Sequence, residues 1–224
     1  MTSLRGDALR ELVTVMDRLR SPGGCPWDAA QTHASLVPYA LEEAYEVAEA
    51  IESGDRAGMR EELGDLLLQV VFHARVAEED LDDPFDLDDV ARGIVAKLVR
   101  RHPHVFGVDA APDAHAVHVR WEQLKQEEKQ RESVLDGIPI ALGALARTQK
   151  VLARARRAGL DGAAPLEQGA PTPTDPARSL GERLLALVVE AEAVGVDAET
   201  ALRETARRVE TEARRRERAR PDGP

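Results

Sequence analysis

The chain has 224 residues, of which 43% are hydrophobic and only 3% aromatic, and its formal net charge at pH 7 is −11. This amount of apolar material can fill the core of one large domain or two small ones. Ala, Leu, Glu and Arg dominate and β-branched runs are scarce, which predicts an all-α protein. The negative charge argues against a general nucleic-acid or membrane-surface binder.

The sequence has a single cysteine and no recognisable targeting segment. Cys25 is the single cysteine, so the sequence supports neither a disulfide framework nor a cysteine-rich zinc site. The sequence contains no signal peptide and no apolar run of membrane-spanning length. We therefore expect a cytoplasmic protein.

A first amphipathic helix is predicted over residues 4–19, and Ser21-Pro22-Gly23-Gly24 ends it. The loop after it contains Trp27, for which packing as a loop anchor is favoured over a ligand contact. Ser35 is expected to cap the second helix, and Asp55 or a near neighbour is expected to start the third.

Two acidic pairs stand on the second and third predicted helices. Glu43 and Glu46 are three residues apart on the second helix, and Glu62 and Asp65 are three residues apart on the third. On a helix this spacing directs both side chains of a pair to one face. Four carboxylates could therefore converge where the two helices pack together.

Most acidic clusters on helices face water, and the position of each carboxylate around the helix axis tests that alternative. On the second helix the main core stripe is expected to consist of Val37, Leu41, Ala44, Ala48 and Ile51. Glu42 and Glu49 lie well away from that stripe, as solvated residues should. Glu43 and Glu46 lie in a second sector whose other members are apolar, namely Leu36, Tyr39, Val47 and Ala50.

The third helix is apolar on almost every side, which predicts that it is buried. Asp65 lies on it among apolar residues, with Gln69 and His73 on the same flank. A buried carboxylate needs a cation or a hydrogen-bond partner, so metal ligation is the favoured interpretation of the four carboxylates. Gly64 weakens this helix by about 1 kcal/mol relative to Ala, and close approach of another helix would explain it.

A fourth predicted helix is followed by a basic run and is marked by Leu87, Val90, Ile94 and Leu98. Lys97 and Arg101 share one of its faces and would suit the phosphates of a metal-bound nucleotide. Basic residues at a helix C-terminus also stabilise the helix dipole, by about 0.3 to 1 kcal/mol, so a structural role stays open.

Trp121 and Lys125 share a face of a further helix, predicted over residues 115–131. The Trp ring could stack on a base while the Lys binds a phosphate. The same spacing also allows an ordinary cation–π pair on a surface helix, and spacing alone does not decide between them.

Taken together, these residues resemble the MazG family of nucleoside triphosphate pyrophosphohydrolases over roughly residues 4–129. The family's metal motif is Glu-Glu-x-x-Glu followed by Glu-x-x-Asp, and it stands here as Glu42-Glu43-Ala44-Tyr45-Glu46 and Glu62-Leu63-Gly64-Asp65. The sequences Gly24-Cys25-Pro26-Trp27-Asp28, Gln31-Thr32 and Arg100-Arg101-His102-Pro103-His104-Val105-Phe106 also look like this family.

The resemblance implies a helical bundle of the all-α NTP pyrophosphohydrolase type that works as a homodimer or a higher homo-oligomer. It implies hydrolysis of nucleoside triphosphates to monophosphate and pyrophosphate, as nucleotide-pool house-cleaning. The implied cofactor is Mg²⁺, with Mn²⁺ as the alternative.

The resemblance also assigns residue roles. The metal ligands would be Glu43, Glu46, Glu62 and Asp65, and Glu42 would orient water or support the ligands. The substrate-binding residues would be Lys97 and Arg101 for the phosphates, with Trp121 and Lys125 completing the nucleotide site.

The C-terminal half looks like a second repeat that has lost its site. We expect a catalytic domain over residues 1–130, a helix and Pro-rich linker over 131–177, and a remnant helical pair with a tail over 178–224. Leu180-Gly181-Glu182 echoes Leu63-Gly64-Asp65, but Ser179 stands where Glu62 does and no Glu-Glu-x-x-Glu precedes it. This half should lack a metal site.

Two other classes of protein remain as alternatives. A non-catalytic helical interaction or regulatory module needs no inward carboxylates and predicts no metal-dependent stabilisation. A di-iron carboxylate bundle would use Glu-x-x-His motifs, and the sequence has none.

Overall fold

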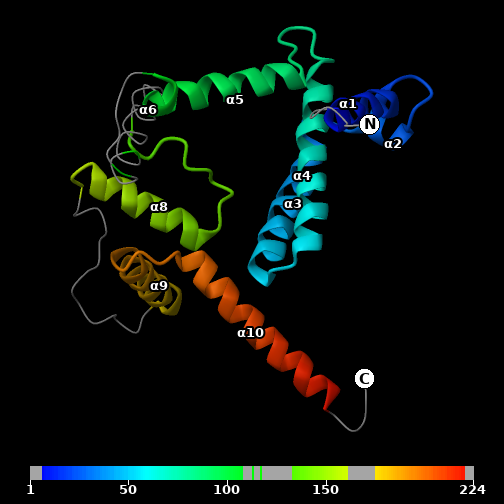
Figure 1. Ribbon diagram of the computed structural model, residues 1–224. Helices are drawn as coiled ribbons and strands as arrows, with labels where there is room; N and C mark the ends of the chain where they lie inside the picture. The colour runs from blue at the N-terminus through cyan, green and yellow to red at the C-terminus, as the bar shows by residue number, and fades with distance from the viewer. Residues whose placement is uncertain (1–6, 108–112, 114–116, 118–132, 161–174, 220–224) are drawn as a thin grey trace. The chain divides into compact units, whose positions relative to one another are not determined.

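The computed structural model describes residues 7–107, 113, 117, 133–160 and 175–219. Every regular element in these ranges is a helix, so the prediction of an all-α fold is confirmed (Figure 1). No helix within them is long and apolar enough to cross a membrane. The chain divides into two compact units, residues 1–125 and 126–224.

The N-terminal unit is built around a helical hairpin. The helices that the structure describes in it are α1 (Asp7–Arg20), α2 (Pro26–Ala30), α3 (His33–Ser53), α4 (Arg56–Ala77), α5 (Leu87–Arg101) and α6 (Pro103–Phe106). Helices α3 and α4 lie side by side and antiparallel, α1 packs against α4, and α5 leaves the C-terminal end of α4 (Figure 1).

Local capping chemistry fixes the ends of the hairpin helices. The Thr32 hydroxyl accepts a hydrogen bond from the Ser35 N–H, and the Ser35 hydroxyl accepts one from the Thr32 N–H. Thr32 is therefore the cap, and the expectation that Ser35 caps α3 was wrong, because Ser35 is the third residue inside a reciprocal capping box. At the turn, Gly54 has a φ of 72° and Asp55 caps α4, which starts where predicted.

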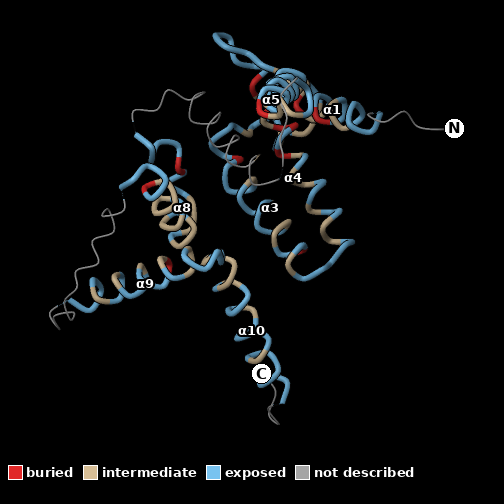
Figure 2. The backbone as a smooth tube through the Cα atoms, turned by 60° about the vertical axis from the view of Figure 1, so that its left-hand side comes forward, coloured by how far each residue is buried: buried red, intermediate tan, exposed pale blue. Residues whose placement is uncertain are grey.

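The hydrophobic core of this unit is small and lies where three helices meet. Its fully buried members come from α1, α3 and α4 and are Met16, Leu36, Val71 and Phe72. Figure 2 shows how few backbone positions are buried and how much of α3 is exposed.

Helix α3 packs on α4 with a different face from the expected one. Leu36 and Ala50 are buried, whereas Val37 and Ile51 of the expected core stripe are 51% and 57% exposed. The predicted core stripe was wrong, because the sector that also carries Glu43 is the one that faces α4.

Helix α4 is also less buried than its sequence predicts. Leu63, Leu67 and Val70 follow one another at i, i+4 and i+7 and are all exposed. A Cβ atom added at Gly64 would meet nothing within 4 Å, so no close helix approach explains this glycine within the described chain. One side of α4 is thus an uncovered apolar surface.

In the described part of the C-terminal unit, residues 133–160 and 175–219, the helices are α8 (Ala144–Arg157), α9 (Pro176–Ala193) and α10 (Ala198–Arg218). The Gln149 side chain on α8 donates to the Val196 carbonyl at 2.7 Å and accepts from the Ala198 N–H, which ties α8 to the start of α10. Val188 of α9 and Val71 of α4 are both 1% exposed. They occupy matching positions, since Val71 lies eight residues after Leu63 and Val188 lies eight residues after Leu180.

A buried arginine joins the ends of α1, α2 and α4. The Arg20 Nε and Nη2 atoms donate to the Glu79 carboxylate at 3.0 and 2.7 Å. Its Nη1 atom donates to the carbonyls of Asp28 and Gln31, and the guanidinium carbon lies 5.6 Å from the Phe72 ring centre. The hydrogen bonds from Arg20 hold the pKa of Glu79 below its ordinary value.

We predict that Arg20→Met lowers the free energy of unfolding by about 2 to 4 kcal/mol, because it removes the Arg20 hydrogen bonds to Glu79 and to two carbonyls, and among the described residues only Arg75 still donates to Glu79. The Glu79 contribution should be complete above the ordinary carboxyl pKa and lost as pH falls through the depressed folded pKa. Urea denaturation followed by circular dichroism measures both. Arg10→Met is the control, since Arg10 is exposed and its pairing with Asp7 is worth less than about 1 kcal/mol. Equal losses in the two variants would contradict the role given to Arg20.

Candidate metal centre

Three carboxylates meet between α3 and α4. Glu43 projects from α3, and Glu62 and Asp65 project from one face of α4 on successive turns. One oxygen atom from each lies within 4.8 Å of the other two, and all three residues are half-buried. Among the residues that the structure describes, this is the one group of three or more acidic, His or Cys side chains arranged to share a metal ion.

The hairpin explains why these residues meet. In two antiparallel helices joined by a short turn, residues at matching distances from the turn face one another. Glu43 therefore lies opposite the α4 turn that carries Glu62 and Asp65, while His33 lies opposite His73 nearer the open end.

The carboxylates repel one another. Partial burial raises the pKa of Glu43, and the charges of Asp65, Glu46 and Glu62 raise it further. The pKa of Glu62 is raised in the same way, first by partial burial and then by Glu46, Glu61 and Asp65. The site thus favours any process that brings in positive charge.

The donor set fits a hard divalent cation. All three groups offer carboxylate oxygens, which are the protein ligands that Mg²⁺ and Mn²⁺ prefer. Mg²⁺ usually takes only one or two protein carboxylates and completes its shell with water and substrate phosphates. Three converging carboxylates are therefore enough for such a site.

Two other predicted acidic residues lie close by but outside the group of three. Glu46 is exposed, and its charge nevertheless raises the pKa of both Glu43 and Glu62. Glu42 is exposed too, and its effect on the pKa of Glu43 is the weakest of the charges that act there. Glu46 as a ligand and Glu42 as a supporting group stay predictions.

The predicted phosphate contacts lie on α5. Lys97 is half-buried and Arg101 is only 4% exposed, at the C-terminal end of that helix. In Figure 1, α5 runs away from the α3–α4 hairpin, so the described chain does not bring this end to the carboxylates. The phosphate contacts stay predictions, and Trp121 and Lys125 lie outside the described residues.

The loop tryptophan is more exposed than the expected anchor. Trp27 on α2 is 52% exposed and meets the Tyr39 ring edge to face, with centroids 6.0 Å apart. Its carbonyl accepts a hydrogen bond from the Gln31 side chain. Tyr39 is one turn from Glu43 on α3, so this aromatic pair stands beside the carboxylate group.

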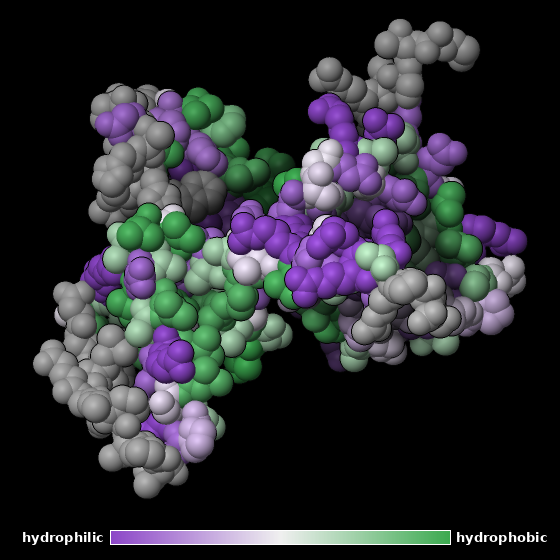
Figure 3. Space-filling model, turned by 90° about the horizontal axis from the view of Figure 1, so that it is seen from below, coloured by the Kyte–Doolittle hydropathy of each residue, from purple (hydrophilic) through white to green (hydrophobic). Residues whose placement is uncertain are grey.

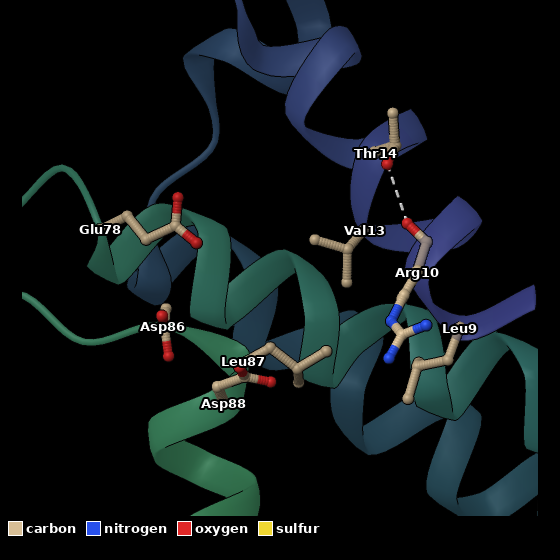
Figure 4. Close-up of a pocket in the computed structure, with 8 residues that line it drawn as sticks. All are labelled: Leu9, Arg10, Val13, Thr14, Glu78, Asp86, Leu87 and Asp88. Atoms are coloured by element: carbon tan, nitrogen blue, oxygen red, sulfur yellow. Dashed lines mark hydrogen bonds between the residues drawn. The ribbon is translucent and has the colours of Figure 1, made fainter. Parts of the chain in front are cut away.

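A separate cleft lies on another side of the unit. It has a volume of about 530 Å³ and is lined by Leu9, Arg10, Val13, Thr14, Glu78, Asp86, Leu87 and Asp88. Figure 4 shows α1 side chains on one side of it and the start of α5 on the other. It contains none of the predicted site residues and is not the candidate metal centre.

Sequence reasoning missed two long-range contacts in the N-terminal unit. The pair of Arg20 and Glu79 joins residues 59 positions apart, and that of His33 and His73 joins residues 40 positions apart. The sequence placed His73 on the flank of Asp65, but it held no signal for its partner.

The fold and the site define an all-α protein whose helical hairpin presents carboxylates from both of its helices. Residues 31–106 match the MazG nucleotide pyrophosphohydrolase domain. The chain belongs to the MazG nucleotide pyrophosphohydrolase family, as the extent of similarity to its relatives shows.

Three relatives illustrate that similarity. An uncharacterised 26.1 kDa protein of Streptomyces cacaoi is 51% identical over 204 residues, which cover 91% of this chain and 80% of that protein. The nucleoside triphosphate pyrophosphohydrolase of Escherichia coli K12 is 50% identical over 154 residues, 67% of this chain and 58% of the enzyme. The nucleoside triphosphate pyrophosphohydrolase/pyrophosphatase MazG of Thermotoga maritima is 38% identical over 217 residues, 91% of this chain and 83% of that protein.

We predict that Glu43→Gln makes the metal-free protein more stable at neutral pH. The raised pKa means that the parent loses stability as pH rises from the ordinary carboxyl pKa through the folded pKa, and the variant does not. The two proteins should converge in acid, where Glu43 is protonated in both states. Thermal melts in a chelator from about pH 4 to pH 8 measure the difference.

Glu49→Gln is the matched control, since Glu49 is an exposed acid on the same helix. It should change the melting temperature little at any pH. The assignment of Glu43 to a repelling cluster fails if both variants give the same profile.

Proposed function

We propose that this protein hydrolyses nucleoside triphosphates between the α and β phosphates, releasing the monophosphate and pyrophosphate. The observation that carries the proposal is the convergence of Glu43, Glu62 and Asp65 between α3 and α4 in a chain of the MazG family. The names of the Escherichia coli and Thermotoga maritima relatives support the substrate class. The proposed role is nucleotide-pool house-cleaning.

The carboxylates would hold Mg²⁺, or Mn²⁺ in its place, with Glu46 as the fourth acidic group. The bound metal supplies charge neutralisation on the phosphates and activation of the attacking water. Glu43 and Glu62 have raised pKa values, so cation binding draws off their protons and metal affinity should increase with pH. Their half-buried position reduces solvent screening of the charges that they offer.

The remaining substrate contacts follow from the family resemblance. Lys97 and Arg101 would bind phosphate oxygens, and Trp121 and Lys125 would complete the nucleotide site. Arg101 is only 4% exposed, and an arginine this buried commonly has a structural role. It can bind phosphate only if its guanidinium reaches the substrate.

We also propose that the working form is a homodimer. Each helix of the hairpin exposes large apolar residues, which on α3 are Val37, Leu41, Tyr45 and Ile51 and on α4 are Leu63, Leu67 and Val70. Soluble monomers rarely leave such faces uncovered. Figure 3 shows apolar residues exposed among polar ones on the face of the molecule that it presents.

The first functional prediction concerns products and the acidic residues that form them. The parent should release pyrophosphate and monophosphate only when Mg²⁺ or Mn²⁺ is added, and Asp65→Asn should lower the rate by more than about 100-fold. Glu182→Gln is the control, since Glu182 occupies the equivalent place on α9. It should stay within about twofold of the parent, because Ser179 replaces the second acid there. Release of orthophosphate and diphosphate would refute the proposed reaction.

The second functional prediction concerns assembly. Leu41→Glu places a charge in the exposed α3 face and should lower the mean mass measured by sedimentation at equal protein concentration. Leu81→Glu is the control, since Leu81 is 98% exposed in the loop after α4 and should leave the mass unchanged. A parent that sediments as a monomer at every concentration would rule out the homodimer.

A further inference from the structure

Two histidines join the open end of the α3–α4 hairpin. The Nδ1 atoms of His33 and His73 are 2.8 Å apart. Their ring planes differ by 3° and the ring centroids are 5.1 Å apart. Because the centroid separation exceeds the Nδ1 separation by about the width of one ring, the rings lie edge to edge in nearly a common plane. This is the geometry of an Nδ1–H···Nδ1 hydrogen bond.

The hydrogen bond between the two rings survives the uptake of one proton by the pair but not of two. With both rings neutral, one Nδ1 carries the bridging hydrogen and the other Nδ1 accepts it, so the accepting ring holds its own proton on Nε2. A first added proton can go to Nε2 of the donating ring and leaves the bond intact. A second must go to the accepting Nδ1, and two N–H groups then face each other. Double protonation therefore breaks the contact.

The surroundings oppose that second proton. His73 is half-buried, and its burial, together with the charge of His33, holds the pKa of His73 below its ordinary value. His33 is exposed, and Asp80 after α4 interacts with it electrostatically. The nearby arginines are engaged elsewhere, Arg20 with Glu79 and Arg75 with Asp17 and Glu79.

The histidine pair and the carboxylates belong to the same two helices. Asp65, Gln69 and His73 follow one another at i, i+4 and i+8 on one face of α4. The hairpin is closed at one end by Gly54 and at the other by the histidine pair, and the carboxylates lie between these two points. Leu36 is the one α3 residue in the buried core cluster. Without the hydrogen bond between His33 and His73, the start of α3 would be held against α4 mainly by Leu36.

We propose that His33 and His73 are positioning residues, whose hydrogen bond fixes α3 against α4 and makes the arrangement of the carboxylate group dependent on protons. The pair holds at neutral pH and opens when both rings are protonated. This proposal concerns the same site as the proposed function. It rests on that function only where the rate of nucleotide hydrolysis is measured.

Three variants test the pair, with Mn²⁺ alone as the probe, titrated by electron paramagnetic resonance. His73→Phe removes the bond at every pH and should weaken Mn²⁺ binding at neutral pH by at least about threefold. His73→Asn supplies an amide that can donate to or accept from the His33 Nδ1 whatever its protonation, so it should keep the parent's affinity. His104→Asn is the control outside the pair and should match the parent.

The pH dependence of melting gives a second readout that needs neither metal nor activity. The unfolded parent binds more protons than the folded one, so its stability should fall as pH drops through about 6.5 and below. His73→Phe and His73→Asn should both lose this component, and only the former should lose Mn²⁺ affinity. A low-field proton resonance from the shared N–H should be present in the parent and absent from both His73 variants.

Superimposable melting profiles for the parent and His73→Phe, or equal Mn²⁺ affinities, would overturn the positioning role. Failure of the parent to hydrolyse any nucleoside triphosphate, with both histidine effects present, would instead refute the proposed function and leave the pair intact. The acid limb of the hydrolysis rate should be shallower in His73→Asn than in the parent.

Discussion

The packing of α3 on α4 is the contact on which the N-terminal unit depends. It buries Leu36 against Val71 and Phe72, and each such side chain contributes about 1.5 to 3 kcal/mol relative to exposure. The same packing brings Glu43 close to Glu62 and Asp65, and the three carboxylates repel one another. Because these groups are partly exposed to solvent, their repulsion is smaller than the stabilisation from apolar burial. Apolar burial thus holds together charges that would otherwise separate, and the proposed cation would relieve the remaining cost.

The single chain leaves this arrangement incomplete in two respects. The outer faces of α3 and α4 are apolar and uncovered, and the basic end of α5 runs away from the carboxylates. The exposed apolar faces are the observation from which we proposed the homodimer. Arg20 joins the ends of α1, α2 and α4, and the histidine pair links α3 to α4 at the open end of the hairpin.

The C-terminal unit shows that helix packing and chemistry are separable. Val188 of α9 and Val71 of α4 are both buried at the same distance from the Leu-Gly-acid sequence, as the predicted repeat requires. The acid at the Glu62 position is replaced by Ser179. A repeat can keep its apolar positions after its carboxylates are lost, because burial stabilises the helices whether or not a metal binds.

The sequence by itself determined the all-α class, the helices of the hairpin, the start of α4 beside Asp55 and the pairing of carboxylates on each helix, because these depend on spacing along one segment. Only the tertiary structure decided which face of α3 meets α4. Both the expected core stripe and the sector that carries Glu43 are apolar, and the pattern along one helix does not determine how that helix is rotated about its axis relative to its neighbour. The same long-range packing decided that Glu46 lies outside the group of three and that His33 meets His73. Contacts between residues 40 positions apart are fixed by how helices pack and not by the pattern within either one.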